Sequence, residues 1–401
     1  MRKNQVRTNS IVSNPGSEIP MRKQFHFFLV LSVLLALSPA VLFNLSAQSE
    51  WTNFRGDAQL TGTSGANIPA QPELLWSFKT GDAIKASPVV SEGIIVAGSV
   101  DGNVYGITLE GKMKWKINTG NGIESAALIK NGVAYIGNLD GKVFAIELQT
   151  GRTLWTYATE GQIMGAPNYW NGNTTGSGDE GVLLIGSYDY FLHGIDASTG
   201  EGLWKYEADN FINGTPAVYE GVAVFGGCDG LLHQVMVRDG SLKKRQPVAT
   251  YVAGSVAVDD WITYVGDYDG KFTCLDIREG RELWSYKNPE ADLPFIASPS
   301  LSEKSVYIGN RDKYVYCFNR ENGDLRWSVN TLGRVDASPV LLNQLLLVAT
   351  MRGDLMLLNA SDGKTRWTYE LGSAVFGNPA VIDGYIIAGA QDGRIYCFGK
   401  K

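Results

Sequence analysis

A unit of about 40 residues repeats along this chain of 401 residues, and that period restricts the possible folds more than any other feature. Its clearest marker is a tryptophan, found at Trp76, Trp115, Trp155, Trp204, Trp284, Trp327 and Trp367. From Trp115 onward each Trp lies four residues after a glycine, and Lys244, four residues after Gly240, replaces the one missing member. Periods of this length are typical of architectures in which each unit stacks on its neighbours.

Two further markers keep the same step. An Asp-Gly pair, or a degenerate form of it, begins at Asp101, Asp140, Asp189, Asp229, Asp269, Asp312, Arg352 and Asp392. A short apolar segment that opens with a small residue begins at Ala86, Ser125, Gly165, Gly214, Gly254, Ala297, Ala337 and Gly377. Three markers in one register predict eight copies of one structural unit.

Each unit predicts four strands. The first unit contains a short segment at Ser87–Val90, an apolar run at Gly93–Gly98, an alternating run at Asn103–Leu109 and a strand that carries Trp115. Asp-Gly between the second and third strands is typical of a tight hairpin, which the Asp side chain caps. Four strands in such a period indicate a propeller blade, so we predict an all-β, eight-bladed β-propeller of four-stranded blades.

The ends of the repeat region predict how the ring closes. The first Trp strand, Leu74–Lys79, comes before any complete unit, while the last unit stops at Phe398 without a Trp strand of its own. We therefore expect the N-terminal strand to supply the outer strand of the eighth blade. The propeller is predicted to span 74–398, with a lead-in at 48–73.

Residues 1–47 are predicted to be an upstream extension plus a signal peptide. Met21-Arg22-Lys23 precede an apolar run at Phe27–Leu37 and a small-residue site that ends at Ala47. An uncleaved membrane anchor is the alternative, and the start at Met1 or Met21 stays open. We expect an exported protein of the periplasm or envelope, and not a lipoprotein, because no cysteine lies near the site.

The net charge of the chain limits the classes of partner that it is expected to bind. The formal net charge is −6, and residues 1–47 carry +4, so the rest of the chain carries −10. Such an acidic body repels phosphate backbones, which excludes nucleic acid as an expected partner. We expect a monomer with a protein partner in the envelope.

The repeats resemble the pyrroloquinoline-quinone (PQQ) type, in which Asp-Gly, a Tyr/Ala strand and Gly-x-x-x-Trp define each blade. The segment from Trp51 to Gly56 also resembles the Trp-x-x-Phe-Arg-Gly opening of exported bacterial propellers of this group. The resemblance implies two alternative functions. The scaffolds of outer-membrane protein assembly, such as assembly factor B, bind proteins, whereas the quinoprotein dehydrogenases use PQQ and calcium at the propeller axis. The chain lacks the acylatable cysteine of the first and the adjacent cysteines of the second.

The cysteines and histidines favour structural roles. Cys274, Cys317 and Cys397 occupy a position that other blades fill with Gly106, Ala145 or Gly194, so they are interpreted as small buried residues. Cys228 has no obvious partner. His193 and His233 have no neighbouring groups of metal-ligand or triad type, and no nucleophile elbow, phosphate loop or His-Glu-x-x-His motif occurs. We therefore predict no catalytic, cofactor-binding or metal site, and no enzyme activity.

The best candidate surface is the axial funnel. The residue just before each innermost strand should point to the channel mouth: Lys85, Glu124, Met164, Asn213, Ala253, Ile296, Asp336 and Phe376. These eight are unlike one another on a repeated framework, as in a scaffold with a binding surface. The polar members Lys85, Glu124, Asn213 and Asp336 are the candidate binding residues, with ordinary loop positions as the alternative.

The sequence thus predicts a non-catalytic exported scaffold that binds protein, and the resemblance implies a role in outer-membrane protein assembly. The alternative is a redox or sensor propeller that binds PQQ or another small molecule in the funnel. A Gly-rich insertion from Trp170 to Glu180 is a second possible partner contact.

Overall fold

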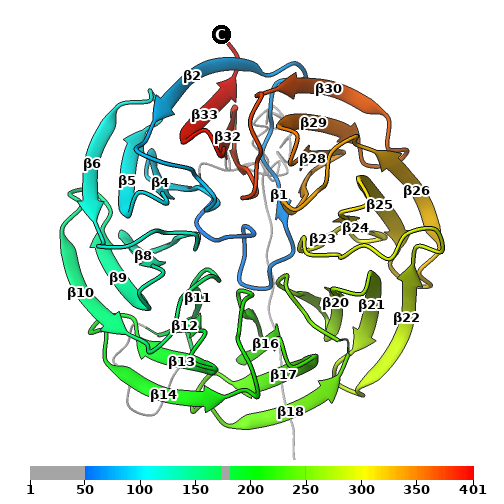
Figure 1. The fold of residues 1–401 in the computed structure, drawn as a ribbon, viewed down its shortest axis with the longest axis horizontal. Helices are drawn as coiled ribbons and strands as arrows, with labels where there is room; N and C mark the ends of the chain where they lie inside the picture. Colours follow the sequence, from blue (N-terminus) through cyan, green and yellow to red (C-terminus); the bar gives the residue numbers. More distant parts are fainter. Residues whose placement is uncertain (1–49, 173–180, 249) are drawn as a thin grey trace, which may run out of the picture. The chain divides into compact units, whose positions relative to one another are not determined.

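The computed structural model describes residues 50–401, except 173–180 and 249. Eight sheets of four strands are arranged as the blades of a ring (Figure 1). The described residues form β-strands and no helix. The predicted all-β, eight-bladed propeller is confirmed. The predicted signal peptide, or anchor, and most of the insertion at 170–180 lie outside the described residues. Within those residues, no helix has the length and apolar character needed to cross a membrane.

Each blade has four antiparallel strands, ordered from the axis outward. The innermost strands are β3 (Val89–Ser91), β7 (Leu128–Lys130), β11 (Asn168–Trp170), β15 (Ala217–Tyr219), β19 (Ala257–Asp259), β23 (Ser300–Leu301), β27 (Val340–Leu342) and β31 (Ala380–Ile382). The second strands are β4 (Ile94–Gly98), β8 (Val133–Gly137), β12 (Val182–Gly186), β16 (Val222–Gly226), β20 (Ile262–Gly266), β24 (Ser305–Gly309), β28 (Leu345–Ala349) and β32 (Tyr385–Gly389).

The third strands are β5 (Asn103–Thr108), β9 (Lys142–Glu147), β13 (Phe191–Asp196), β17 (Leu231–Met236), β21 (Lys271–Asp276), β25 (Tyr314–Asn319), β29 (Asp354–Asn359) and β33 (Arg394–Gly399). The outer strands are β6 (Met113–Asn118), β10 (Thr153–Ala158), β14 (Gly202–Glu207), β18 (Leu242–Pro247), β22 (Arg281–Lys287), β26 (Leu325–Asn330), β30 (Thr365–Glu370) and β2 (Glu73–Lys79). A short strand, β1 (Thr63–Ser64), adds in parallel to β27.

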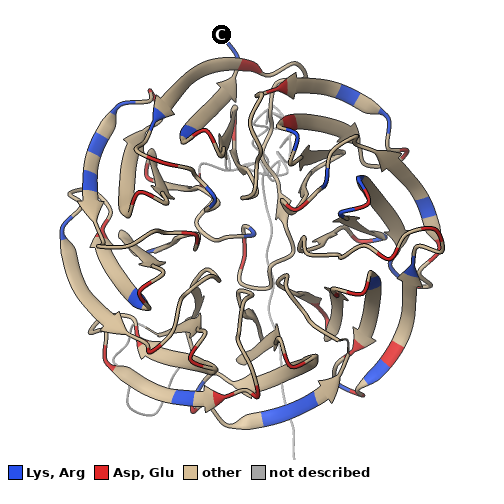
Figure 2. Cartoon of the chain, in the orientation of Figure 1, with Lys and Arg blue, Asp and Glu red and all other residues tan. Residues whose placement is uncertain are grey.

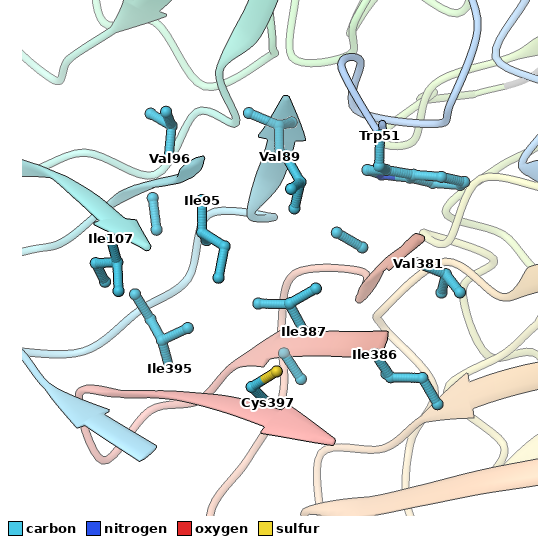
Figure 3. Close-up of a cluster of buried hydrophobic side chains, with 14 of the residues drawn as sticks. Trp51, Val89, Ile95, Val96, Ile107, Val381, Ile386, Ile387, Ile395 and Cys397 are labelled. Carbon is cyan, nitrogen blue, oxygen red and sulfur yellow. The ribbon is translucent and has the colours of Figure 1, made fainter. Parts of the chain in front are cut away.

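The N-terminal strand closes the ring, as predicted. β2 is the outer strand of the eighth blade and pairs antiparallel with β33, with Trp76 opposite Cys397. A continuous apolar core joins the first blade to the eighth; it includes Ile95, Ile387 and, from the segment before the ring, Trp51 (Figure 3). Closure therefore leaves no open seam between the first and last blades.

The repeated tryptophans dock each blade on the next. The indole N–H of Trp115 donates a hydrogen bond to the carbonyl of Leu148 in the following blade, at 2.7 Å. Its ring lies against Gly151, where a Cβ would come within 2.7 Å of the indole and where φ is +77°. Equivalent indole hydrogen bonds are made by Trp76, Trp155, Trp204, Trp284 and Trp327. Each Gly-x-x-x-Trp motif thus provides two parts of the contact. Its glycine receives the indole of the preceding blade, and its own indole packs on the glycine of the following blade.

The blade without a tryptophan replaces it with two side chains. Lys244 lies against Gly280 and donates to the carbonyl of Arg278 at 3.2 Å. Opposite Lys244, the buried amide of Gln234 donates to the carbonyl of Ile277 at 2.9 Å, the position equivalent to the indole acceptors elsewhere. The interblade hydrogen bond is therefore kept although the indole is lost.

The position that three of the cysteines share with Gly106 and Gly194 lies against a tryptophan. The residue there lies opposite the tryptophan of its own blade, as Cys317 lies opposite Trp327 and Gly106 opposite Trp115. A Cβ at Gly106 would come within 2.1 Å of the Trp115 ring. At Gly106 the limit on size therefore comes from the indole of the same sheet. All four cysteines are free and buried, as the sequence indicated.

The segment that precedes the ring, from Trp51 to Asn67, fills one end of the central channel (Figure 1). The N–H groups on the inner edges of the blades would otherwise lack partners, and this segment accepts hydrogen bonds from them. Its backbone carbonyls accept from Val90, Ile129, Val218, Val258, Leu301, Leu341 and Gly384, while the Asn53 side chain donates to Asn168 of the third blade. This plug segment therefore bonds to all eight blades.

The Trp-x-x-Phe-Arg-Gly motif builds the turn of the plug segment. Trp51 and Arg55 are fully buried, and the Arg55 guanidinium donates to the carbonyl of Pro299 and the hydroxyl of Ser300, each at 2.9 Å. Gly56 has φ +89°, and a Cβ there would come within 2.9 Å of the Trp51 ring. Burial lowers the pKa of Arg55 to about 9, so the guanidinium stays charged at neutral pH.

Candidate functional site: the axial funnel

The open end of the channel is a funnel whose wall comes from all eight blades. A cavity of about 150 Å³ lies on the axis, and Phe54 of the plug segment contributes to its lining. All eight residues that the sequence placed at the channel mouth line this one cavity: Lys85, Glu124, Met164, Asn213, Ala253, Ile296, Asp336 and Phe376. The repeat brings them together because each lies four residues before the innermost strand of its blade.

A belt of hydrogen bonds below the mouth fixes the funnel wall. Two residues after each mouth position, several blades carry a hydroxyl that accepts from the backbone N–H of the preceding blade. Ala166 donates to Thr215, Thr215 to Ser255, Ser255 to Ser298, Ser298 to Ser338, and Asn378 to Ser87. These bonds are buried, so they hold neighbouring blades at a fixed spacing and make the funnel a preformed surface.

Two ion pairs lie at the funnel mouth. The Lys85 ammonium is 2.7 Å from Glu124, and their side chains are 33% and 21% exposed. Arg311, which the sequence did not single out, donates to both carboxylate oxygens of Asp336 at 3.1 and 3.0 Å. The bond to Asp336 raises the pKa of Arg311. Three of the four predicted polar residues are thus held in pairs rather than free.

Asn213, the fourth predicted residue, connects the funnel to a surface cluster. Its amide donates to the hydroxyl of Tyr251 at 2.6 Å and to the Sγ of Cys228 at 3.2 Å. Its carbonyl oxygen is buried and has no hydrogen-bond partner among the described residues. Burial raises the pKa of the Cys228 thiol, which argues against a reactive thiolate.

The two buried histidines serve the hairpins. His193 Nε2 lies 3.0 Å from the Asp189 carboxylate and its Nδ1 lies 3.0 Å from the hydroxyl of Tyr157. His233 repeats this arrangement with Asp229 and Tyr206. In other blades a tyrosine at the same position donates to the hairpin Asp, as Tyr105 donates to Asp101. These pairs were not predicted from the sequence, although the four-residue Asp-to-His spacing is visible in the repeat.

The described residues offer little for metal or PQQ binding. No group of three or more His, Cys, Asp or Glu side chains in this part of the chain could hold a metal ion. PQQ is a tricarboxylate, so its site would need several unpaired cations. The described cavity lining contains a single cation, Lys85, and it already pairs with Glu124. These residues do not fit PQQ.

The fold and the repeats define a PQQ-type β-propeller. A family model described as "Outer membrane protein assembly factor BamB" matches residues 66–163, 140–290, 225–331 and 311–401. These overlapping matches cover the whole ring, so the chain belongs to this family.

Individual relatives match over shorter stretches. Over 105 residues the chain is 32% identical to the beta-alanine-activating enzyme of Homo sapiens, covering 24% of this chain and 10% of that protein. Over 145 residues it is 26% identical to the outer membrane protein assembly factor BamB of Yersinia pestis, covering 33% of this chain and 37% of that protein. The matched part therefore spans about a tenth of the first protein and just over a third of the second.

Solved structures share the fold. BamB from Moraxella catarrhalis is 21% identical with a TM-score of 0.68, covering 82% of this chain and 98% of that one. The quinohemoprotein alcohol dehydrogenase of Comamonas testosteroni is 14% identical with a TM-score of 0.72, covering 88% and 81%. At these identities the likeness concerns the fold alone.

Proposed function

We propose that the chain is a non-catalytic, exported scaffold that binds a protein partner through its funnel face and acts in outer-membrane protein assembly. One observation carries this proposal: eight unlike side chains converge on one preformed funnel while the framework around them repeats. Family membership supports the assembly role. His193 and His233 pair with the hairpin Asp residues and the four cysteines are buried, which supports a function without catalysis. We expect the scaffold to act as a monomer.

The ion pairs determine how the proposal is tested. Lys85→Glu alone would place two carboxylates together, and Asp336→Lys would do the same with two cations, so each would cost stability. Exchanging both members keeps each pair and the net charge but reverses the direction of each pair at the mouth. The test protein therefore carries Lys85→Glu with Glu124→Lys, and Arg311→Asp with Asp336→Arg.

We expect the exchanged protein to lose at least about tenfold in capture of its partner from envelope extracts, because charge arrangement sets orientation and specificity at interfaces. Its melting temperature should change little, since partly exposed ion pairs contribute only about 0–1 kcal/mol. The matched control exchanges Glu147 and Arg152, an ion pair 3.4 Å apart between β9 and β10 on the face opposite the funnel. Capture that is equal in both exchanged proteins would move the binding surface away from the funnel.

A second candidate function is the binding of a small polar molecule in the funnel. The axial cavity of about 150 Å³ favours it, because polar side chains such as Lys85, Glu124 and Asn213 line it. Mass spectrometry and absorbance of protein purified from its native envelope would detect such a ligand. Steady turnover of alcohols or sugars with added PQQ, calcium and an electron acceptor would contradict the scaffold function and indicate a redox enzyme.

A further inference from the structure

The two faces of the ring differ in charge. The funnel face consists of the loops from each outer strand to the next innermost strand and the hairpins between the second and third strands. Its loops contain fifteen Asp or Glu and five Lys or Arg, a net charge of −10. The described loops of the opposite face, between the same strands, contain twelve acids and seven bases, a net of −5. Figure 2 shows acidic residues along many of the loops nearest the axis. The funnel face is therefore the more acidic one.

An arc of aromatic side chains lies on this face, over the third to fifth blades. Phe211 stacks on Tyr188 with ring centroids 4.4 Å apart and contacts Tyr190 at 5.2 Å. Tyr251 and Tyr268 form an edge-to-face pair at 5.0 Å. Tyr190, Phe211 and Tyr268 are 43%, 37% and 45% exposed, a large aromatic area to leave in water.

The two aromatic groups are one connected surface. The Cys228 N–H donates to the carbonyl of Phe211, and Asn213 donates to both Cys228 and Tyr251. The Tyr268 N–H donates to the carbonyl of Tyr251, and Arg311 donates to the Tyr268 hydroxyl at 3.5 Å. The arc therefore runs from Tyr190 along the funnel mouth to the ion pair at Asp336, and backbone and side-chain bonds hold it in place.

Carboxylates belong to the same hairpins as the aromatic rings. Asp189 follows Tyr188 and has a side chain only 6% exposed that pairs with His193, and Asp267 is buried, whereas Asp269 next to Tyr268 is exposed. Burial by itself raises the pKa of Asp189, but hydrogen bonds from His193 and from backbone amides outweigh it and lower the pKa. Asp189 is therefore ionised at neutral pH. An aromatic face that carries negative charge attracts cations both through the ring quadrupole and through the carboxylates.

We propose that the aromatic arc binds a basic, extended segment of the partner protein, with Arg or Lys side chains over Phe211 and Tyr268. This proposal rests on the proposed protein-binding function and adds the chemistry of the segment recognised. Neutral or acidic segments lack the cation that the rings and carboxylates select. The net charge of −10 on this face provides the long-range attraction that brings such a segment to the arc.

The test uses two fluorescent peptides of equal length, one alternating Arg with Leu and the other alternating Glu with Leu. We expect the Arg peptide alone to bind the whole protein, and its affinity to fall at least about tenfold between about 50 and 300 mM salt. Phe211→Ala with Tyr268→Ala should weaken binding about tenfold. Phe211→Leu with Tyr268→Leu, which keeps apolar bulk but removes the rings, should weaken it nearly as much.

The control replaces two exposed apolar side chains on outer strands, Met113→Ala and Leu325→Ala, and should leave peptide affinity unchanged. Melting curves establish that each variant is folded. Equal binding of the Glu peptide, or Arg-peptide binding that both arc variants retain, would overturn the proposal. Partner capture measured in parallel separates the two claims. Capture that responds to the funnel exchanges but not to the arc variants sinks this inference and keeps the scaffold function, whereas capture that responds to neither removes both.

Discussion

Deleting residues 48–79 should leave the chain unfolded or aggregated. The deletion removes β2, so the eighth blade would expose β33 as an unpaired edge. It also removes the plug segment, which bonds to every blade and places the fully buried Trp51 and Arg55 in the interior. The unpaired edge of β33, added to the loss of two buried side chains and of the hydrogen bonds of the plug segment, is expected to exceed the total stability of an ordinary domain, about 5–15 kcal/mol.

Circular dichroism, melting curves and light scattering measure this outcome. The control lacks only residues 1–47 and should melt cooperatively as a monomer. A second protein begins at residue 68, so it keeps β2 but lacks the plug segment. We expect this protein to fold with a lower melting temperature and with a wider opening of the central channel. A soluble monomer with an unchanged melting temperature after the full deletion would contradict the closure model.

Trp284→Ala should lower the free energy of unfolding by about 3–5 kcal/mol, the usual range for truncating a buried aromatic side chain. The side chain is 8% exposed and packs against Tyr264, Phe272 and Phe318, with centroids 5.8–6.0 Å away. Its indole N–H bonds to the carbonyl of Arg320 at 2.9 Å. The substitution therefore removes packing within one blade and docking on the next.

The matched control is Lys244→Ala at the equivalent position of the neighbouring blade. Gln234 already makes the interblade hydrogen bond there, so we expect a loss below about 1 kcal/mol. Urea unfolding of the two variants and the parent protein measures both values. Equal losses at the two positions would mean that the tryptophans do not carry the docking energy.

The repeat made the fold predictable to an unusual degree. The three markers gave the blade number, and the orphan strand at Leu74–Lys79 predicted β2 beside β33. The eight mouth positions could be named because a blade repeats its geometry at a constant offset from the innermost strand. The sequence and the structure repeat with the same period, so the place of a residue within the sequence repeat gives its place within a blade.

What the sequence did not predict lies outside the repeat. The plug segment occurs once, so no periodic signal reveals that Trp51, Arg55 and the neighbouring carbonyls meet eight blades. Arg311 belongs to a hairpin, and its pairing with Asp336 of the next blade depends on spacing between sheets. Lys244 and Gln234 together replace the missing tryptophan, but they lie on different strands, β18 and β17. A comparison of one repeat position at a time therefore cannot detect the replacement.

The most direct test of the central claim uses a photo-crosslinking amino acid. It is introduced at Phe376 in the funnel mouth, and separately at Met113 on the outer rim, in the cells that produce the protein. We predict a discrete protein adduct from position 376 and none from position 113. An adduct from the rim alone would contradict the proposal that the funnel face of this propeller binds a protein partner.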